Sequence, residues 1–539
     1  MVKAASVTSL VLGNLFFAPR RALRTHLAGL RSLLRASGIP PETIEKIPKD
    51  PRTINSHFRL DPVVHQFLSC PKCHCLYPYS PGSHPLPNSS GLDVISQGGP
   101  AADTSEGQYS GITGKCLYQQ TPQSQPCNTP LWKLCDIGGG RTRSAPVRKY
   151  LHQDLKSWLG RMLSRKGVED AIEACHPSVP FDPDIPISDI WSSKIFSLLR
   201  DAKGRPFFPG PSDEGRLIFS LSIDGFNPFH NKTAKRTASS TGIWLVLLNL
   251  PPHERCLIDN IFLAGVIPDK PSMHQVNHYI ALVVKDLQEF WEPGVFFSHT
   301  YRWREGRTFR AMLVPLVADM PAVRQAIGIA SGSRAHYFCT LCELDIDDLD
   351  FMKPEEWPRK DPHHIREFAT AWKNAPSEKY QEQIFEACGI RWSALLDLPY
   401  WDPVLYSVVE SMHALDLGLF QHHCRDLFQI DIKVEGGDGF AAPRPPVDKR
   451  LITGLKPLQD CVEVISLNRS HLLYELLEFH RKVLFTICLD NEIRRGEGMA
   501  IIGTKWVLAN QIYTWVRGSL SRHWPSVFKV CRSAPEPRR

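Results

Sequence analysis

The stretch Phe219–Leu250, FSLSIDGFNPFHNKTAKRTASSTGIWLVLLNL, joins two apolar runs through a polar, basic connection. The first run, 217–223, has serines between its apolar residues and ends at Asp224-Gly225, a pair typical of turns. The second run, 242–250, stops at Pro251-Pro252, because proline has no N–H to donate to a sheet. We therefore expect two buried strands, the first of which leaves a carboxylate at its end.

Four segments on the C-terminal side continue this pattern. They are predicted as a strand, a helix, a strand and a helix, at 260–267, 274–291, 309–318 and 321–328. Asp319 lies between the last strand and its helix, with Pro321 in the first helical turn. The order strand, strand, strand, helix, strand, with an acid after the first strand and after the last, predicts a mixed α/β fold with a ribonuclease-H-like sheet.

Asp224 and Asp319 are the first candidate catalytic residues. Because each follows a strand, both can meet at one sheet edge and hold divalent metal, and carboxylates suit Mg²⁺ or Mn²⁺. Two such ions about 3.5–4 Å apart serve two-metal phosphoryl transfer. Lys232, Lys235 and Arg236, in the connection after the first acid, are candidates to hold a phosphate. The alternative is structural: a turn aspartate and a helix N-cap.

Five motifs resemble one protein family. They are IDGFNPF (223–229), LNLPP (248–252), LAGVIP (263–268), LVADMPAVRQAIG (316–328) and HYFCTLC (336–342). Together they resemble the transposases of CACTA (En/Spm-type) DNA transposons, above all the lineage abundant in mushroom-forming fungi, from about Ser69 to the C-terminus. The resemblance implies that Asp224 and Asp319 are the first two members of an acidic triad in a ribonuclease-H-like domain.

The third acid of the triad is the open point. Family proteins extend beyond the length of this chain, and we expect their third acid in that extension, which would make this chain a truncated copy. Glu410 is the best substitute within the chain, with Asp426 behind it.

Cysteines group around two CxxC pairs. Cys70 and Cys73 form the first pair, and Cys116 and Cys127 are predicted to complete a four-thiolate Zn²⁺ site with them. Other cysteines nearby compete for the second half of the site, and buried free cysteines are the alternative. The resemblance supports the site, because the family carries a CPxC…LYP segment and further cysteines ahead of its catalytic domain.

Cys339 and Cys342 form the second pair. In the family this pair is matched by an acid-x-x-His motif, most often with Asp, so Glu410-x-x-His413 departs conservatively. The resemblance implies a Zn²⁺ site of Cys339, Cys342 and His413, with His336 as the nearest fourth ligand. The alternative is that the histidines after Glu410 only pack against and cap their helix.

The most basic stretch, 138–167, contains the candidate DNA contacts. Arg148 and Lys149 precede a predicted helix with an apolar side, and Arg161 and Arg165 add charge along it. A positive face backed by an apolar stripe can bind phosphates without reading sequence. The alternative is the solvated face of a packing helix.

Bulk composition agrees with an intracellular, nucleic-acid-binding protein. Its 539 residues suggest two or three domains, and 63 Lys+Arg against 56 Asp+Glu give a mildly basic net charge of +7. The 15 cysteines cluster as in metal sites or reduced thiols. No apolar run reaches the roughly 20 residues that span a bilayer, so we expect no membrane partner.

Residues 1–40 contain no Asp or Glu and resemble a mitochondrial presequence or an interrupted secretory signal. The alternative is a basic amphipathic helix at about 23–34, or an upstream segment joined by a doubtful gene model. A DNA-acting enzyme favours the alternative and a nuclear location.

We expect five regions. They are an N-terminal helical and basic segment, a cysteine-rich zinc-binding module, a basic helical linker, a ribonuclease-H-like domain with a helical insertion, and a helical C-terminal region, at 1–69, 70–136, 137–205, 206–430 (insertion about 345–398) and 431–539.

The predicted function is metal-dependent DNA strand cleavage and transfer at transposon ends. The expected partner is double-stranded DNA of the terminal repeats, and assembly of several copies is left open. The alternative is an inactive remnant that only binds DNA or protein through its zinc modules. An unrelated zinc hydrolase is disfavoured, because the chain has no HExxH or comparable spacing.

Overall fold

The computed structural model describes most of the chain as two compact units. The units are residues 1–65 with 153–161, and 66–152 with 162–539. The described residues are 2–14, 19–58, 60–80, 114–175, 184, 189–227, 240–272, 274–330, 336–428, 430, 455–468 and 470–519. Three candidate phosphate contacts lie outside them: Lys232, Lys235 and Arg236.

The first unit is helical. Its helices are α1 (Val2–Asn14), α2 (Arg20–Ala36), α3 (Pro41–Glu45), α4 (Pro51–His57) and most of α5 (Leu155–Leu163). Leu27 of α2 is fully buried in one core with Ala5, Ile47 and Ile54. This burial explains the amphipathic pattern of α2 and confirms the helix predicted at about 23–34.

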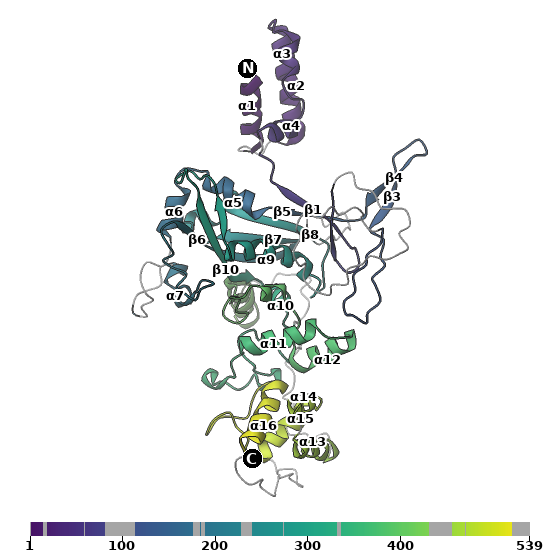
Figure 1. The fold of residues 1–539 in the computed structure, drawn as a ribbon, viewed down its shortest axis with the longest axis vertical. Coiled ribbons are helices and arrows are strands. Elements are labelled where there is room, and N and C mark those ends of the chain that lie inside the picture. The colour runs from purple at the N-terminus through teal and green to yellow at the C-terminus, as the bar shows by residue number, and fades with distance from the viewer. Residues whose placement is uncertain are drawn as a thin grey trace. The chain divides into compact units, whose positions relative to one another are not determined.

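A mixed sheet forms the centre of the second unit, and nine of the strands in the described part of the chain belong to it (Figure 1). Its strands are β1 (Val64–Ser69), β2 (Leu76–Pro78), β5 (Lys149–Gln153), β6 (Glu214–Phe226), β7 (Ser240–Leu247), β8 (Ile261–Pro268), β9 (Val295–Phe297), β10 (Arg307–Ala318) and β11 (Ser407–Val409). The order is β11-β10-β6-β7-β8-β5-β1-β2, and β9 also pairs with β10. A mixed α/β fold is thereby confirmed.

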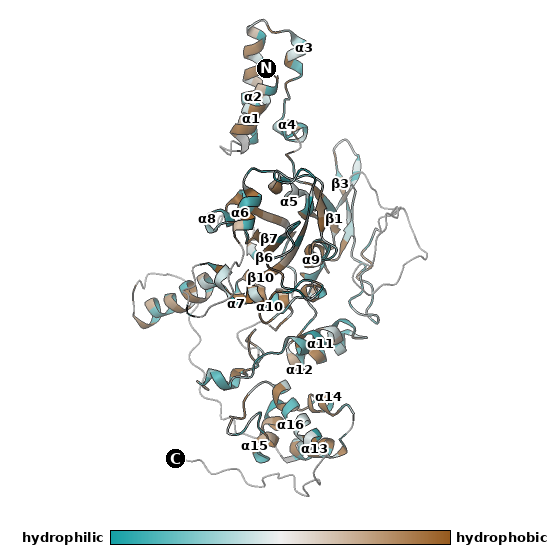
Figure 2. Cartoon of the chain, turned by 60° about the vertical axis from the view of Figure 1, so that its left-hand side comes forward, coloured by the Kyte–Doolittle hydropathy of each residue, from teal (hydrophilic) through white to brown (hydrophobic). Residues whose placement is uncertain are grey.

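Strand direction within this sheet divides at β6. β6, β7 and β8 follow one another antiparallel, whereas β10 runs parallel to β6 on its other side and β11 runs parallel to β10. Leu217, Phe219 and Leu221 of β6 are fully buried, and burial of each such side chain is worth about 1.5–3 kcal/mol. Figure 2 shows the apolar character of β6 and β7. The apolar runs of the sequence therefore predicted these strands, but the predicted turn at Asp224-Gly225 is wrong: β6 continues to Phe226, because both residues pair with β7.

Helices join and flank the strands of the second unit. The longer ones are α9 (Asn277–Trp291), α10 (Met320–Ile327), α11 (Pro362–Lys373), α12 (Glu378–Cys388), α13 (Leu455–Leu467), α15 (Arg481–Asp490) and α16 (Lys505–Ser519), and the shorter ones are α6 (Val168–Ala174), α7 (Lys194–Leu198), α8 (Pro252–Arg255) and α14 (Leu472–Leu476). α9 packs against β10, and α11 and α12 lie between β10 and β11 in the chain. No helix in the described ranges is long and apolar enough to cross a membrane.

The segment predicted as a basic helical linker differs from the prediction. It contains β4 (Thr142–Pro146), which pairs with β3 (Trp132–Asp136), and then β5, so its helix α5 begins only at Leu155. Tertiary pairing explains the strand: His152 of β5 pairs with Gly265 of β8. A Cβ on Gly265 would lie 2.6 Å from the Leu151 carbonyl oxygen, so glycine permits this close approach.

Candidate functional site

Asp224 and Asp319 lie at the same edge of the sheet, near the C-terminal ends of neighbouring parallel strands. β6 and β10 are aligned at Leu221 and Leu316. The two aspartates follow these partners after equal numbers of residues. Aligned positions of neighbouring strands share one face of a sheet, so the fold brings together two acids that are far apart in the sequence.

Glu410 lies at this edge as well. β10 and β11 are aligned at Ala318 and Val409, and Asp319 and Glu410 are the residues that follow. The three acids therefore lie at the C-terminal ends of three adjacent parallel strands, Asp224 within the last residues of β6 and the other two directly after β10 and β11, with Asp319 in the middle. Their oxygens do not form one of the groups of described ligand atoms that all lie within 4.8 Å of one another.

The two aspartates differ in their surroundings. Asp224 is exposed. Asp319 is half-buried, and its Oδ1 accepts a hydrogen bond of 2.7 Å from the N–H of Ala322, so it is the N-cap of α10. This cap uses one of the two carboxylate oxygens. The N-cap alternative for Asp319 is therefore correct as a structural role, and it leaves Oδ2 for another partner.

Glu410 is held as an anion by the segment that follows it. Its carboxylate accepts hydrogen bonds from the N–H of Met412 at 2.7 Å and of His413 at 2.8 Å. The hydrogen bond from the His413 N–H is the main reason why the pKa of Glu410 lies below its ordinary value. His413 Nδ1 also lies 2.6 Å from the same carboxylate. The acid-x-x-His motif thus forms an internal pair.

The Cys339–Cys342 pair has the backbone geometry of a zinc knuckle, but no other ligand atom of the described residues forms a group with it. The Leu341 N–H donates to Cys339 Sγ at 3.4 Å, and a hydrogen bond from Cys342 lowers the pKa of the Cys339 thiol to about 5. Within the described residues, no third ligand atom completes a group with this pair, neither His413 nor His336. His413 contacts Glu410, as described above. His336 Nδ1 lies 3.1 Å from Asp345 Oδ1.

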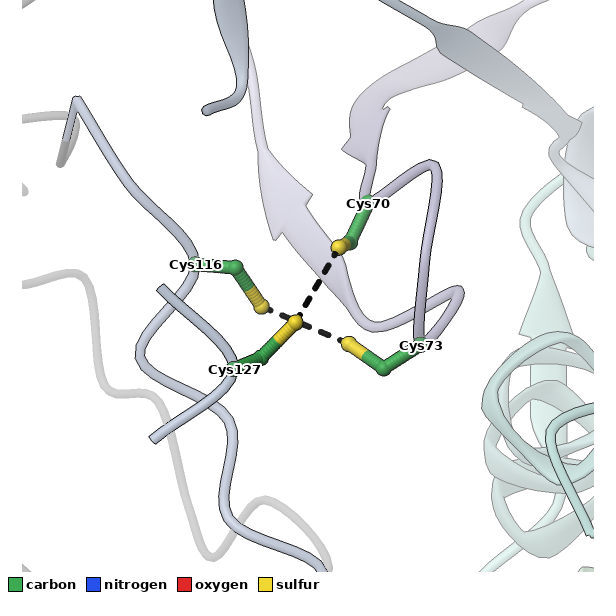
Figure 3. A group of neighbouring side chains, drawn as sticks. All are labelled: Cys70, Cys73, Cys116 and Cys127. Atoms are coloured by element: carbon green, nitrogen blue, oxygen red, sulfur yellow. Dashed lines mark hydrogen bonds between the residues drawn. The ribbon is translucent and has the colours of Figure 1, made fainter. Parts of the chain in front are cut away.

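The other four predicted thiolates do come together (Figure 3). The sulfurs of Cys70, Cys73, Cys116 and Cys127 all lie within 4.8 Å of one another. Cys70 and Cys127 are 3.7 Å apart, and Cys73 and Cys116 are 3.4 Å apart. Zn–S bonds of about 2.3 Å in a tetrahedron place sulfurs about 3.8 Å apart, so this donor set fits Zn²⁺.

The local backbone structure helps to position the sulfurs of this cluster. Cys70 follows β1, and its sulfur accepts the N–H of Lys72 at 3.4 Å, the same contact as in the second pair. His74 follows in a left-handed conformation with φ of 62°. The pKa of the Cys116 thiol lies well below its ordinary value because Cys70 and then Cys73 donate hydrogen bonds to it.

A third group of ligand-type atoms consists of His336, Asp345 and Asp347. Arg481 of α15 lies against it, with Nε 3.2 Å from Asp345 and Nη1 3.8 Å from Asp347. A guanidinium already neutralises these carboxylates, so we assign the group to an ion-pair network and not to a metal. No local pattern of residues indicates this network, because Arg481 is distant in the chain.

Three of the four residues predicted to contact DNA form hydrogen bonds or ion pairs within the protein. Arg148 forms an ion pair with Asp269 at 3.1 Å. Arg161 donates to the backbone oxygens of Leu60 and Asp61 at 3.1 and 2.7 Å. Arg165 donates to the Asn260 side chain at 2.7 Å. Lys149 is exposed, and its Nζ lies 4.5 Å from the centre of the Tyr79 ring. Lys149, Arg161 and Arg165 are exposed and Arg148 is half-buried, so exposure alone does not separate the candidate DNA contacts.

Comparison with known proteins supports a transposase family for the central segment. Residues 205–357 match the family model described as Transposase family tnp2. The match contains β6, β10, Asp224, Asp319 and the Cys339–Cys342 pair. A search of curated proteins gave no match to the chain.

Proposed function

We propose that the chain is a DNA transposase of the CACTA type, of the fungal lineage that its motifs resemble, acting in the nucleus on the terminal repeats of its transposon. One observation carries the proposal: Asp224, Asp319 and Glu410 lie at the C-terminal ends of three adjacent parallel strands, in a chain whose segment 205–357 matches a transposase family.

The strand order supports a ribonuclease-H-like domain. Three antiparallel strands in sequence order, β6, β7 and β8, are extended on the other side of β6 by the parallel strands β10 and β11. The first, fourth and fifth strands of this arrangement each deliver one of the three acids. The insertion with α11 and α12 separates the fourth strand from the fifth in the chain and leaves their pairing intact.

The three acids fit Mg²⁺ or Mn²⁺ by their chemistry. All are oxygen donors. Neighbouring strands lie about 4.8 Å apart, so acids on three successive strands flank two positions and not one. Bound divalent metal would stabilise the attacking and leaving oxygens of an in-line displacement.

The protein's own groups have distinct tasks in this proposal. The N-cap to Ala322 fixes the orientation of Asp319. The N–H groups of Met412 and His413 keep Glu410 ionised. Asp224 is exposed and is the acid most accessible to a phosphodiester. The four-thiolate cluster is assigned to structural Zn²⁺ outside the reaction.

Cleavage of a terminal-repeat duplex in the presence of Mn²⁺ tests the proposal. Asp224→Asn, Asp319→Asn and Glu410→Gln should each lower the rate of strand nicking at least about 100-fold, whereas Asp213→Asn, a change at an exposed aspartate, should not. Unchanged nicking by Glu410→Gln would remove Glu410 from the site. Binding without any nicking by the unmodified protein would instead establish the alternative, an inactive remnant that retains DNA binding.

A further inference from the structure

β3 and β4 form a two-stranded antiparallel ribbon that pairs with no other strand in the described part of the chain (Figure 1). Lys133 pairs with Ala145, and Cys135 pairs with Arg143. The pairing extends past the strands, since the Ile137 N–H donates to the Arg141 carbonyl at 3.0 Å. The ribbon is thus an element of its own.

One face of this ribbon carries three cations. Paired residues of an antiparallel ribbon share a face, and every second residue returns to it. Lys133, Arg141 and Arg143 therefore lie on the same face, whereas Asp136 belongs to the opposite one. We call these three residues the ribbon cations. All are exposed, and none forms an ion pair with a described residue.

The tip of the ribbon is open. Gly138, Gly139 and Gly140 have φ of 87°, 64° and 71°, a left-handed conformation in which side chains other than glycine are strained. No heavy atom lies within 4 Å of a Cβ built on any of them. Glycine is thus required here by the turn and not by a neighbour, and a partner can approach the tip closely.

The base of the ribbon is anchored in the cysteine cluster. Leu131, directly before β3, is buried with Leu68, Cys70 and Cys116. The Val147 N–H, directly after β4, donates to the Leu131 carbonyl at 2.9 Å. The four-thiolate site therefore fixes the position from which the ribbon extends.

We propose that the ribbon binds double-stranded DNA, with Lys133, Arg141 and Arg143 directed at phosphates. This inference rests on the proposed function, in which the chain acts on duplex DNA. Unpaired cations on one face complement the phosphate backbone, and the major groove of B-form DNA admits a two-stranded ribbon. The major groove of duplex RNA is too narrow for such an element, which favours DNA.

Salt-dependent binding of the full chain to a duplex DNA probe tests the inference. In Lys133→Gln/Arg141→Gln/Arg143→Gln, the slope of log affinity against log salt should decrease by about 3, one for each phosphate that the protein no longer neutralises. The matched control is Lys194→Gln/Lys203→Gln/Lys379→Gln, which removes the same charge at exposed sites and should keep the slope. Because all the exchanged side chains are exposed, thermal unfolding should be unchanged in both variants.

The outcomes separate this inference from the proposed function. If the ribbon variant keeps the slope of the unmodified protein, the ribbon assignment is wrong while DNA binding and the catalytic proposal stand. If the ribbon cations affect binding to duplex RNA but not to duplex DNA, the choice of DNA is wrong. Absence of any duplex binding by the unmodified protein would overturn both proposals.

Discussion

At the scale of single residues, Asp319 has two roles that different substitutions separate. Its Oδ1 caps α10, and its charge belongs to the proposed metal site. Asparagine keeps a capping oxygen, whereas alanine does not. We predict that Asp319→Asn changes the free energy of unfolding by less than about 0.5 kcal/mol yet abolishes nicking, and that Asp319→Ala also reduces stability by about 1 kcal/mol.

Chemical denaturation and nicking assays on the same preparations check this prediction. Nicking by Asp319→Asn at the unmodified rate would show that the cap is the only role of Asp319. Equal destabilisation by both substitutions would show that the negative charge, and not the capping oxygen, stabilises the start of α10.

The residues that the sequence predicted well are those whose neighbours in the chain define their position. Asp224 and Asp319 follow apolar runs, which indicate locally that both lie near strand ends, although β6 continues two residues past Asp224. Arg148 could not be placed in this way, because its partner Asp269 is far from it in the chain. His413 was expected to join the distant Cys339–Cys342 pair, whereas its partner is Glu410, three residues before it. The sequence shows which side chains carry a charge or can bind a metal, but not which partner each of them contacts in the folded chain.

At the scale of secondary structure, we expect the ribbon to depend on the four-cysteine cluster at its base, which we propose to hold Zn²⁺. Cys127→Ser should remove one Zn²⁺ per chain, because three thiolates and a hydroxyl form a weaker site than four thiolates. We then expect faster amide hydrogen exchange at Val147, whose N–H donates to the Leu131 carbonyl, and weaker DNA binding. Metal analysis and hydrogen-exchange mass spectrometry provide the measurements.

The control for this prediction is Cys256→Ser, at an exposed cysteine outside the cluster. It should keep both the metal content and the exchange rate. Zinc retained in full by Cys127→Ser would contradict the four-thiolate assignment, and slow exchange after metal loss would show that the ribbon is anchored by apolar contacts alone.

Strands were predictable where a long apolar run within one segment indicates that the segment is buried. β6, β7, β8 and β10 bury nearly continuous apolar runs, as strands of a covered sheet do. β5 was missed because it alternates exposed and buried residues over only five positions and joins the sheet through a close approach to Gly265. The apolar residues from Leu151 to Met162 lie on one side of a helix, which predicted a helix from the sequence, and tertiary pairing overrode that preference in β5.

At the scale of the whole molecule, buried charges join segments that are far apart in the chain. Asp348 accepts hydrogen bonds from Arg481 at 2.5 Å and from the Gly503 N–H at 3.1 Å. Glu343 accepts from Thr504 at 3.0 Å and pairs with Lys360 at 2.9 Å. These contacts join the segment that matches the transposase family to α15 and to the residues directly before α16, so that segment shares its core with residues beyond it.

Arg481 is the residue on which this connection depends most. It lies between the carboxylates of Asp345 and Asp348, which are both buried. Arg481→Met would leave two buried carboxylates without their counter-ion, and breaking a buried pair in this way costs about 3–5 kcal/mol. We predict a decrease of this size in the free energy of unfolding, measured by chemical denaturation, whereas Arg304→Met, at an exposed arginine, should cost little.

The combination Asp345→Asn/Asp348→Asn/Arg481→Met distinguishes ion pairing from simple packing of the arginine stem. Because the unpaired charges are removed together with the arginine, the triple variant should be more stable than Arg481→Met alone, by at least about 1 kcal/mol of coupling free energy. If the three substitutions are instead additive, Arg481 acts through its contacts with the Gly503 carbonyl and the Phe485 ring, and the aspartates are satisfied without it. Recovery in the triple variant would show that electrostatic neutralisation joins the insertion to the C-terminal helices.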